Sequence, residues 1–142
     1  MAEREREFSL RIIAADKVFY NGPAVSVTVT APDGKYGILA GHSNMAAAVT
    51  PGILSYRTKD GETFHAAVSD GVIKVSGGDV LILVESAESP DDIDVIRARR
   101  SAQDAEEELK RSNSSLEFRS ASAKLSRAMT RIKVYSEYNH KH

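Results

Sequence analysis

The sequence predicts an α+β fold, in which an antiparallel β-sandwich or barrel is followed by an antiparallel two-helix hairpin. All nine glycines and all four prolines lie within residues 1–90, whereas residues 91–142 contain neither. Because glycine and proline mark turns and destabilise helix interiors, the first part is typical of short strands and the second of long helices. We therefore expect two domains, residues 1–88 and residues 89–142.

The first part shows the period-two alternation of half-buried strands. Val25, Val27 and Val29 alternate with serine and threonine, and a Pro32-Asp33-Gly34 turn follows directly. Further apolar or β-branched segments are separated by turn sequences. The predicted strands are 8–14, 17–20, 25–30, 36–39, 53–58, 63–68, 72–75 and 80–84. We expect roughly eight to ten strands here, at the density typical of sandwiches and barrels.

The second part has the start and stop signals of two helices. Ser89 is the expected N-cap of the first helix, with Pro90 at its first position and Asp92 as the acid of a capping box. The basic and polar segment 110–115 predicts its end. A second helix is expected from about residue 116 to about residue 138, which makes an antiparallel hairpin.

Small and apolar side chains recur in steps of three and four along both predicted helices, so they form two facing stripes. The stripes consist of Ala98, Ala102, Ala105 and Leu109, and of Ala121, Leu125, Ala128, Ile132 and Tyr135. Because each buried methylene-sized group contributes only about 0.8 kcal/mol, an alanine-rich seam is weaker than a leucine seam. A ligand or a partner can switch an element held this weakly between packed and open arrangements.

Four charged residues are expected to lie together beside this seam, at the end away from the hairpin turn. With the turn centred near residues 113–114, Arg97 comes close to Arg127 and Arg131, and Asp94 lies one helical turn before Arg97. Three guanidinium groups and one carboxylate suit a phosphate chain with a polar ring or a hydroxyl donor. The alternative is a solvated salt-bridge face, in which each pair contributes about 0–1 kcal/mol.

Composition argues against several classes of function. The formal net charge of −1 gives no general attraction to nucleic acid or anionic lipid. The chain has no cysteine, and its four histidines lack metal-ligand spacing, so no metal site is expected. The longest apolar run, residues 80–84, is too short to insert into a bilayer. The N-terminus resembles neither a secretory signal nor a transit peptide, which favours a cytosolic chain.

The neighbouring residues His42 and Ser43 raise the question of a small hydrolase, since histidine titrates near neutrality and serine can be a nucleophile. Side chains adjacent in sequence seldom have the geometry of a base and its nucleophile. No Gly-x-Ser-x-Gly elbow occurs, and no third group is evident. The sequence also lacks a glycine-rich phosphate loop before a helix. We therefore expect no catalytic residue and a structural or interface role for His42.

The order and spacing of several short segments resemble the epsilon subunit of the rotary proton-translocating ATP synthase, from about residue 8 to about residue 134. These segments are Gly37-Ile38-Leu39-Ala40-Gly41-His42, Pro51-Gly52, Ser69-Asp70-Gly71, Ala87-Glu88, Ile93-Asp94-Val95-Ile96-Arg97-Ala98, Ala105-Glu106-Glu107, and Arg127-Ala128 through Arg131-Ile132-Lys133-Val134. The resemblance implies a ten-stranded β-sandwich and a two-helix domain in a non-catalytic subunit of the central stalk.

The same resemblance implies partners and a regulatory role. The sandwich of such subunits binds the gamma subunit and the membrane c-ring, which places Lys35, Gly41, His42 and Ser43 at the expected interface. Their hairpin lies folded on the sandwich, or opens along gamma into the alpha/beta catalytic head and inhibits ATP hydrolysis. The implied subunit couples proton flow to ATP synthesis, needs no cofactor, and is peripheral on the cytoplasmic face of the bacterial cell membrane.

Several bacterial members of the family bind ATP in the folded state, through an Ile/Leu-Asp-x-x-Arg-Ala motif and arginines on the second helix. The resemblance therefore implies ATP as a regulatory ligand of this chain. The corresponding residues are Glu88, Ile93, Asp94, Arg97, Ala98, Arg127 and Arg131. The chain departs from the family's usual pattern at Asp70, where glycine is usual, at Lys35, where an acid is common, and at Asp104, where some ATP-binding members have arginine.

A second hypothesis, of a different class, is a free-standing adaptor. In that case the β domain supports a helical hairpin that docks other proteins. The two hypotheses differ in what the chain retains from native membranes, because only the first predicts recovery of gamma and the catalytic head.

Overall fold

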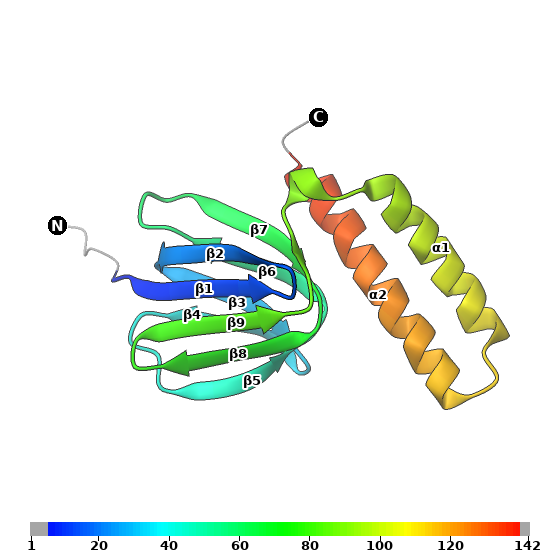
Figure 1. The fold of residues 1–142 in the computed structure, drawn as a ribbon, viewed down its shortest axis with the longest axis horizontal. Helices are drawn as coiled ribbons and strands as arrows, with labels where there is room; N and C mark the ends of the chain where they lie inside the picture. Colours follow the sequence, from blue (N-terminus) through cyan, green and yellow to red (C-terminus); the bar gives the residue numbers. More distant parts are fainter. Residues whose placement is uncertain (1–5, 140–142) are drawn as a thin grey trace.

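Two five-stranded sheets face each other in the computed structural model, which describes residues 6–139 (Figure 1). The strands are β1 (Phe8–Ala14), β2 (Lys17–Ala24), β3 (Ser26–Ala31), β4 (Gly34–Leu39), β5 (Met45–Val49), β6 (Gly52–Arg57), β7 (Thr63–Val68), β8 (Gly71–Ser76), β9 (Asp79–Val84) and β10 (Ala87–Glu88). The sheet orders are β2-β1-β9-β8-β5 and β10-β7-β6-β3-β4. Neighbouring strands pair antiparallel except β1 and β9, which run parallel. The predicted sandwich is confirmed.

The core lies between the two sheets and is built from the predicted alternation. Val27 and Val29 of β3 are buried, and their serine and threonine neighbours are only partly covered. Leu10, Leu54 and Ile82 contribute from three other strands and are completely inaccessible to solvent. Apolar side chains on the inner faces of both sheets therefore hold the sandwich together.

Two strands do not correspond to any segment located in the sequence. β5 contains three alanines in its five residues, and alanine has a low β-propensity. β10 has two residues, Ala87 and Glu88, which pair with Val68 and Ala67 of β7. The local sequence pattern of both strands is weak. They form because they pair with strands that are distant in sequence.

The hairpin follows a short 3₁₀ helix, η1 (Pro90–Asp92), and its first helix starts later than predicted. Ser89 is the cap residue of η1, but its side chain makes no capping hydrogen bond, so the predicted capping box is wrong. The N-cap of α1 (Val95–Arg111) is Asp94, whose Oδ1 accepts a hydrogen bond from the Arg97 amide at 3.0 Å. Between them Ile93 is extended and buried, which interrupts the helix.

The second helix, α2 (Ser115–Tyr138), begins almost where the sequence predicts. Its N-cap, Ser114, accepts a hydrogen bond from the Glu117 amide, and the Glu117 carboxylate accepts one from the Asn113 amide. The predicted alanines of both stripes are buried in the seam between the helices, whereas the larger members Leu109, Leu125, Ile132 and Tyr135 are only partly buried. The seam is therefore narrow and rich in alanine.

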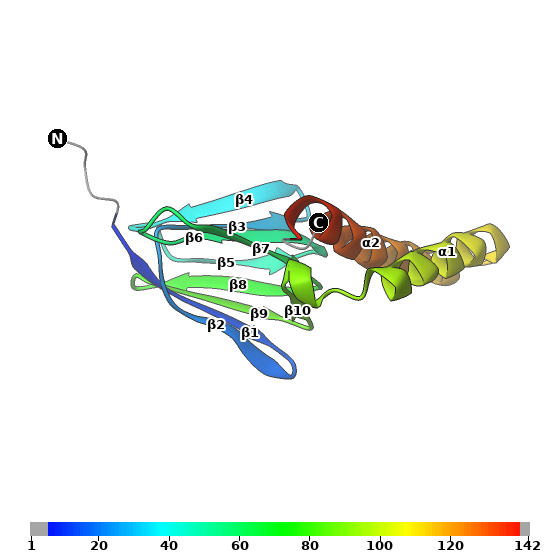
Figure 2. The same cartoon turned by 90° about the horizontal axis from the view of Figure 1, so that it is seen from above.

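α2 lies against the sandwich, and α1 packs on the other side of α2 (Figures 1 and 2). A small cluster of Ala67, Ile93 and Val134 joins α2 to the outer face of β7, with Ile53 and Tyr135 packed around it. Val134 is completely buried although it lies outside the predicted stripe, because it faces the sandwich rather than α1. Neither described helix has the length and apolar character needed to cross a membrane.

Candidate functional site

The start of α1, the C-terminal part of α2 and the end of β10 enclose a polar cavity of about 410 Å³. Its lining residues are Glu88, Asp92, Asp94, Arg97, Ala98, Ser101 and Arg131. Five of the seven residues that the sequence indicates for ATP therefore lie around one cavity. They come together because α1 and α2 run antiparallel, which brings Arg131, about two turns before the end of α2, beside the first turn of α1.

The guanidinium of Arg131 links α2 to the sandwich. Its Nε donates a hydrogen bond to Oε1 of Glu88, and both side chains are about one-third exposed, at 31% and 29%. Because Glu88 belongs to β10, this ion pair joins the helical hairpin to the sheet edge. Arg131 also lines the cavity, and its guanidinium has further N–H donors with which it can bind a second anion.

Asp94 has two tasks in this arrangement. One carboxylate oxygen caps α1 through the Arg97 amide, and the side chain also lines the cavity. The cap fixes the first turn of α1, which sets the position of the Arg97 side chain on the same cavity wall. The motif residues Asp94 and Arg97 are therefore coupled through the backbone.

Arg127 and Ile93 do not line this cavity. Arg127 points toward the turn between β7 and β8, where its Nη1 lies 3.9 Å from Oδ2 of Asp70. Asp70 is the residue that replaces the family's usual glycine, so the departure from the pattern supplies this ion pair. Ile93 is buried beneath the start of α1, against Ala67 and Val134, and contributes packing only.

Two cavity residues were not indicated by the sequence as site residues. Asp92 is the predicted acid of a capping box that does not form, and it lines the cavity instead. Ser101 lies one helical turn after Arg97, on the same face of α1, so helical spacing alone could have identified it. Three carboxylates and two guanidiniums thus surround the space, with a hydroxyl beside them.

The residues predicted to face the c-ring or gamma divide between the two ends of the sandwich. Gly41, His42 and Ser43 lie in the loop between β4 and β5, at the end far from the hairpin (Figure 1). Lys35 lies at the opposite end of β4, roughly 20 Å away along the strand, and lines a groove together with Lys133 of α2. The structure therefore does not bring Lys35 together with the other three residues.

The loop residues do not form a base–nucleophile pair. The Nδ1 atom of His42 lies 2.8 Å from the backbone carbonyl oxygen of Ser43, to which it donates a hydrogen bond. The Gly41 backbone has a φ of +81°, which favours glycine at this turn. Among residues 6–139 no group of three or more metal-ligating side chains gathers, and the predicted tail histidines His140 and His142 lie outside the described residues.

Comparison with protein-family models gives a match over almost the whole chain. Residues 7–90 match the model described as the ATP synthase delta/epsilon chain β-sandwich domain, and residues 91–136 match the model for the long α-helix domain of the same chain.

Individual relatives agree with these models. The chain is 40% identical to the ATP synthase epsilon chain of Ruminococcus albus, over 89% of this chain and 95% of the relative. It is 36% identical to the ATP synthase epsilon chain of Ruminiclostridium cellulolyticum, over 88% of this chain and 92% of the relative.

The same fold occurs in solved structures. One chain of the Euglena gracilis mitochondrial ATP synthase, in a structure of OSCP, F1 and c-ring, superposes with a TM-score of 0.78 and 21% identity, over 91% of this chain and 81% of that chain. A chain from the central stalk and c-ring of the Tetrahymena thermophila mitochondrial ATP synthase superposes with a TM-score of 0.68 and 13% identity, over 94% and 99%. With its two matching domains and its close bacterial relatives, this chain belongs to the ATP synthase delta/epsilon chain family.

Proposed function

We propose that this chain is a non-catalytic rotor subunit of a bacterial ATP synthase, and that its sandwich contacts the gamma subunit and the c-ring. Its bacterial relatives are named ATP synthase epsilon chain, and similar folds occur in structures described as central stalk and c-ring. The loop of Gly41, His42 and Ser43 is the candidate contact with the c-ring, because it projects from the end of the sandwich opposite the hairpin. The subunit then works on the cytoplasmic face of the membrane, as a peripheral protein.

Native membranes that contain the assembled ATP synthase provide a direct test. A tagged copy of the full chain is expected to recover the gamma subunit and the alpha/beta catalytic head after mild detergent extraction. A copy with His42→Glu and Ser43→Glu, which places two negative charges in the exposed loop, is expected to retain less of the c-ring. Recovery of unrelated proteins without gamma supports the free-standing adaptor instead.

We also propose that the cavity between α1, α2 and β10 binds ATP as a regulatory ligand. The observation that carries this proposal is the meeting of Arg97 and Arg131, from two different helices, around one space of about 410 Å³. Guanidinium groups bind phosphate oxygens with paired hydrogen bonds. The carboxylates of Glu88 and Asp94 can accept hydrogen bonds from the amino group of the base and from ribose hydroxyls.

Such a ligand would favour the folded hairpin. The cavity exists only while α1, α2 and β10 lie together, so ATP binds this arrangement in preference to an open one. The stabilisation follows RT ln(1 + [ATP]/Kd), or about 2.7 kcal/mol at one hundred times Kd. The affinity therefore sets the ATP concentration below which the hairpin opens and inhibits hydrolysis in the catalytic head.

The intact chain is expected to gain thermal stability in millimolar ATP, and Arg97→Ala or Arg131→Ala is expected to abolish the gain. The measurement is the melting temperature with and without ATP, by calorimetry. The comparison is the ATP-dependent shift within each variant, since Arg131→Ala also loses the Glu88 ion pair. Arg100→Ala, an exposed arginine on α1 away from the cavity, is the matched control and keeps the shift. An unchanged melting temperature of the unmodified chain in ATP contradicts the proposal.

A further inference from the structure

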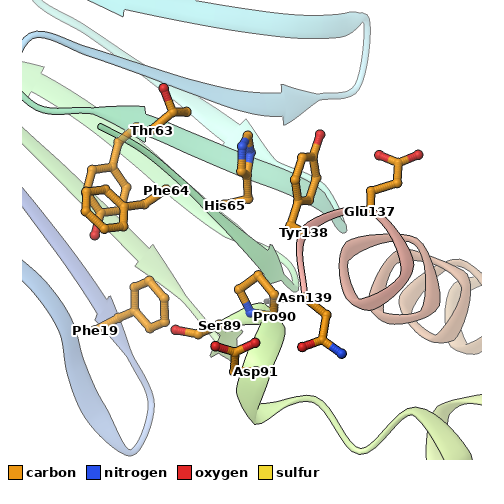
Figure 3. Close-up of a pocket in the computed structure, with 11 residues that line it drawn as sticks. Phe19, Thr63, Phe64, His65, Ser89, Pro90, Asp91, Glu137, Tyr138 and Asn139 are labelled. Atoms are coloured by element: carbon orange, nitrogen blue, oxygen red, sulfur yellow. The ribbon is translucent and has the colours of Figure 1, made fainter. Parts of the chain in front are cut away.

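The last turn of α2 is held on the sandwich by two stacked rings. The imidazole of His65, on β7, and the phenol of Tyr138, the last residue of α2, have ring centroids 3.6 Å apart and an interplanar angle of 12°. Figure 3 shows the two rings lying face to face at the junction of strand and helix. The edge of the imidazole is held as well, because its Nδ1 lies 2.7 Å from the hydroxyl of Ser55 on β6.

This stack is part of a short attachment zone. Val134 is buried against Ala67 one turn earlier along α2, and Asn139, directly after Tyr138, is also buried. The other end of α2 projects into solvent, where Leu116 and Phe118 are 71% and 53% exposed. The apolar contacts that fasten the hairpin to the sandwich are therefore concentrated in the last two turns of α2.

We propose that the stack of His65 on Tyr138 is a catch that holds the hairpin closed, and that protonation of His65 weakens the catch, so that the hairpin opens more readily in acid. The proposal rests on the proposed function in one respect, since it requires a hairpin that can leave the sandwich. It adds proton concentration as a second input to the same switch, independent of ATP.

The surroundings of His65 determine whether its protonation favours the closed or the open hairpin. Burial lowers the pKa of His65 below its ordinary value of 6.5, and the neighbouring Glu137 carboxylate on α2 raises it by a smaller amount. The other charged groups on this side are Arg57, two residues along β6 from Ser55, and Asp91 of η1, which lines the adjoining cavity. The closed arrangement therefore favours the neutral imidazole.

The pH dependence follows by linkage. When the hairpin leaves, His65 becomes exposed and regains its ordinary pKa, so the open arrangement binds a proton more tightly than the closed one. The contribution of His65 to closure is fully present above pH 6.5 and is lost as the pH falls through the lower pKa of the closed arrangement. Acidification of the surrounding solution then favours the open, inhibitory arrangement.

The catch and the ATP cavity are separate. The cavity of about 460 Å³ beside the ring stack is lined by residues including Phe64, His65, Glu137 and Tyr138, and it shares no lining residue with the cavity around Arg97. Variants of His65 can therefore test the catch without touching the proposed nucleotide contacts.

The experiment measures the open fraction of the full chain by distances between two spin labels, at pH 8 and at pH 5, without ATP. The chain has no cysteine, so Asn113→Cys at the hairpin turn and Lys59→Cys between β6 and β7 supply two exposed labelling sites. We expect the open fraction of the labelled chain to increase several-fold at pH 5, because the open arrangement binds a proton more tightly than the closed one. Tyr138→Leu, which removes the stack, is expected to raise the open fraction already at pH 8.

His65→Phe is the decisive variant, because phenylalanine can keep the ring stack but cannot be protonated. It is expected to remain closed at both pH values. His42→Phe, and separately the pair His140→Gln and His142→Gln, are the matched histidine controls and should keep the pH dependence. An open fraction that does not change with pH in the labelled chain overturns the proposal, and so does a pH dependence that survives His65→Phe.

Failure of the catch can be told apart from failure of the ATP proposal. At pH 8, His65→Phe is expected to keep the ATP-dependent shift in melting temperature, and Arg131→Ala is expected to keep the pH-dependent opening. Loss of the ATP shift in the unmodified chain therefore contradicts only the nucleotide site. Loss of the pH response with an intact ATP shift contradicts only the catch.

Discussion

Replacing Gly71 by alanine is expected to destabilise the sandwich by about 4 kcal/mol or more, the range reached only by severe substitutions. A Cβ atom at this position would lie 1.9 Å from the carbonyl oxygen of Leu83 and 2.8 Å from the Cα atom of Val84. Both atoms are backbone of the neighbouring strand β9, so no side chain can turn aside to relieve the overlap. Since small domains have about 5–15 kcal/mol of total stability, much of the chain is expected to be unfolded or aggregated.

The measurement is denaturant unfolding of the full chain. Gly37→Ala is the matched control, because this glycine also lies in a strand. A Cβ there would have its nearest contact, with the Thr28 hydroxyl oxygen, at an ordinary distance of 3.8 Å. The control is expected to stay within about 1 kcal/mol of the unmodified chain. A similar unfolding midpoint for both variants contradicts the steric argument at Gly71.

Replacing Val134 by aspartate is expected to detach the hairpin while the sandwich remains folded. Val134 is completely buried in contact with Ala67 and Ile93, so an aspartate would place an unpaired carboxylate in an apolar cluster. Burying an unpaired carboxylate in such surroundings costs several kcal/mol. The chain can avoid that cost by releasing α2 into water. ATP should then no longer raise the melting temperature, because the proposed cavity requires α2 in place.

Limited proteolysis and NMR spectra separate these effects. In Val134→Asp, protease is expected to cleave within residues 115–138 at least tenfold faster, while the amide signals of β1, β8 and β9 stay where they are. Ser136→Asp adds the same charge two residues away at an exposed position and is the control. Loss of the sandwich signals, or unchanged protease resistance of α2, argues against independent attachment of the hairpin.

The strands could largely be predicted because their inner faces repeat every second residue. Val25, Val27 and Val29 show this clearly, and all three are buried. β5 was not predicted because its three consecutive alanines show no alternation of apolar and polar side chains. β10 was not predicted because two residues are too few to show a period. The first helix begins at Val95 rather than at Pro90 because Ile93 is buried against the sandwich, and no local signal reports a contact of that kind.

In the candidate site, too, the positions set by helical spacing could be predicted, and those set by contacts distant in sequence could not. The antiparallel arrangement of two helices is enough to bring Asp94, Arg97 and Arg131 together, and the structure gathers all three around one cavity. Arg127 is predicted to join them, but it lies outside the cavity lining, with its Nη1 3.9 Å from the Asp70 carboxylate on the turn after β7. Helix spacing predicts which side chains share a face of the hairpin. It does not predict which of them form contacts with residues of the sandwich.

The fastening of α2 at one end makes it a lever arm. Its 24 residues span about 36 Å, and the fulcrum lies at Val134–Tyr138. A tilt of about 20° at that fulcrum carries the hairpin turn roughly 12 Å, about the diameter of a helix with its side chains. A protonation or a bound nucleotide at the base therefore need only loosen or tighten a few contacts to move the exposed tip, with Leu116 and Phe118, over a distance that a neighbouring protein can sense.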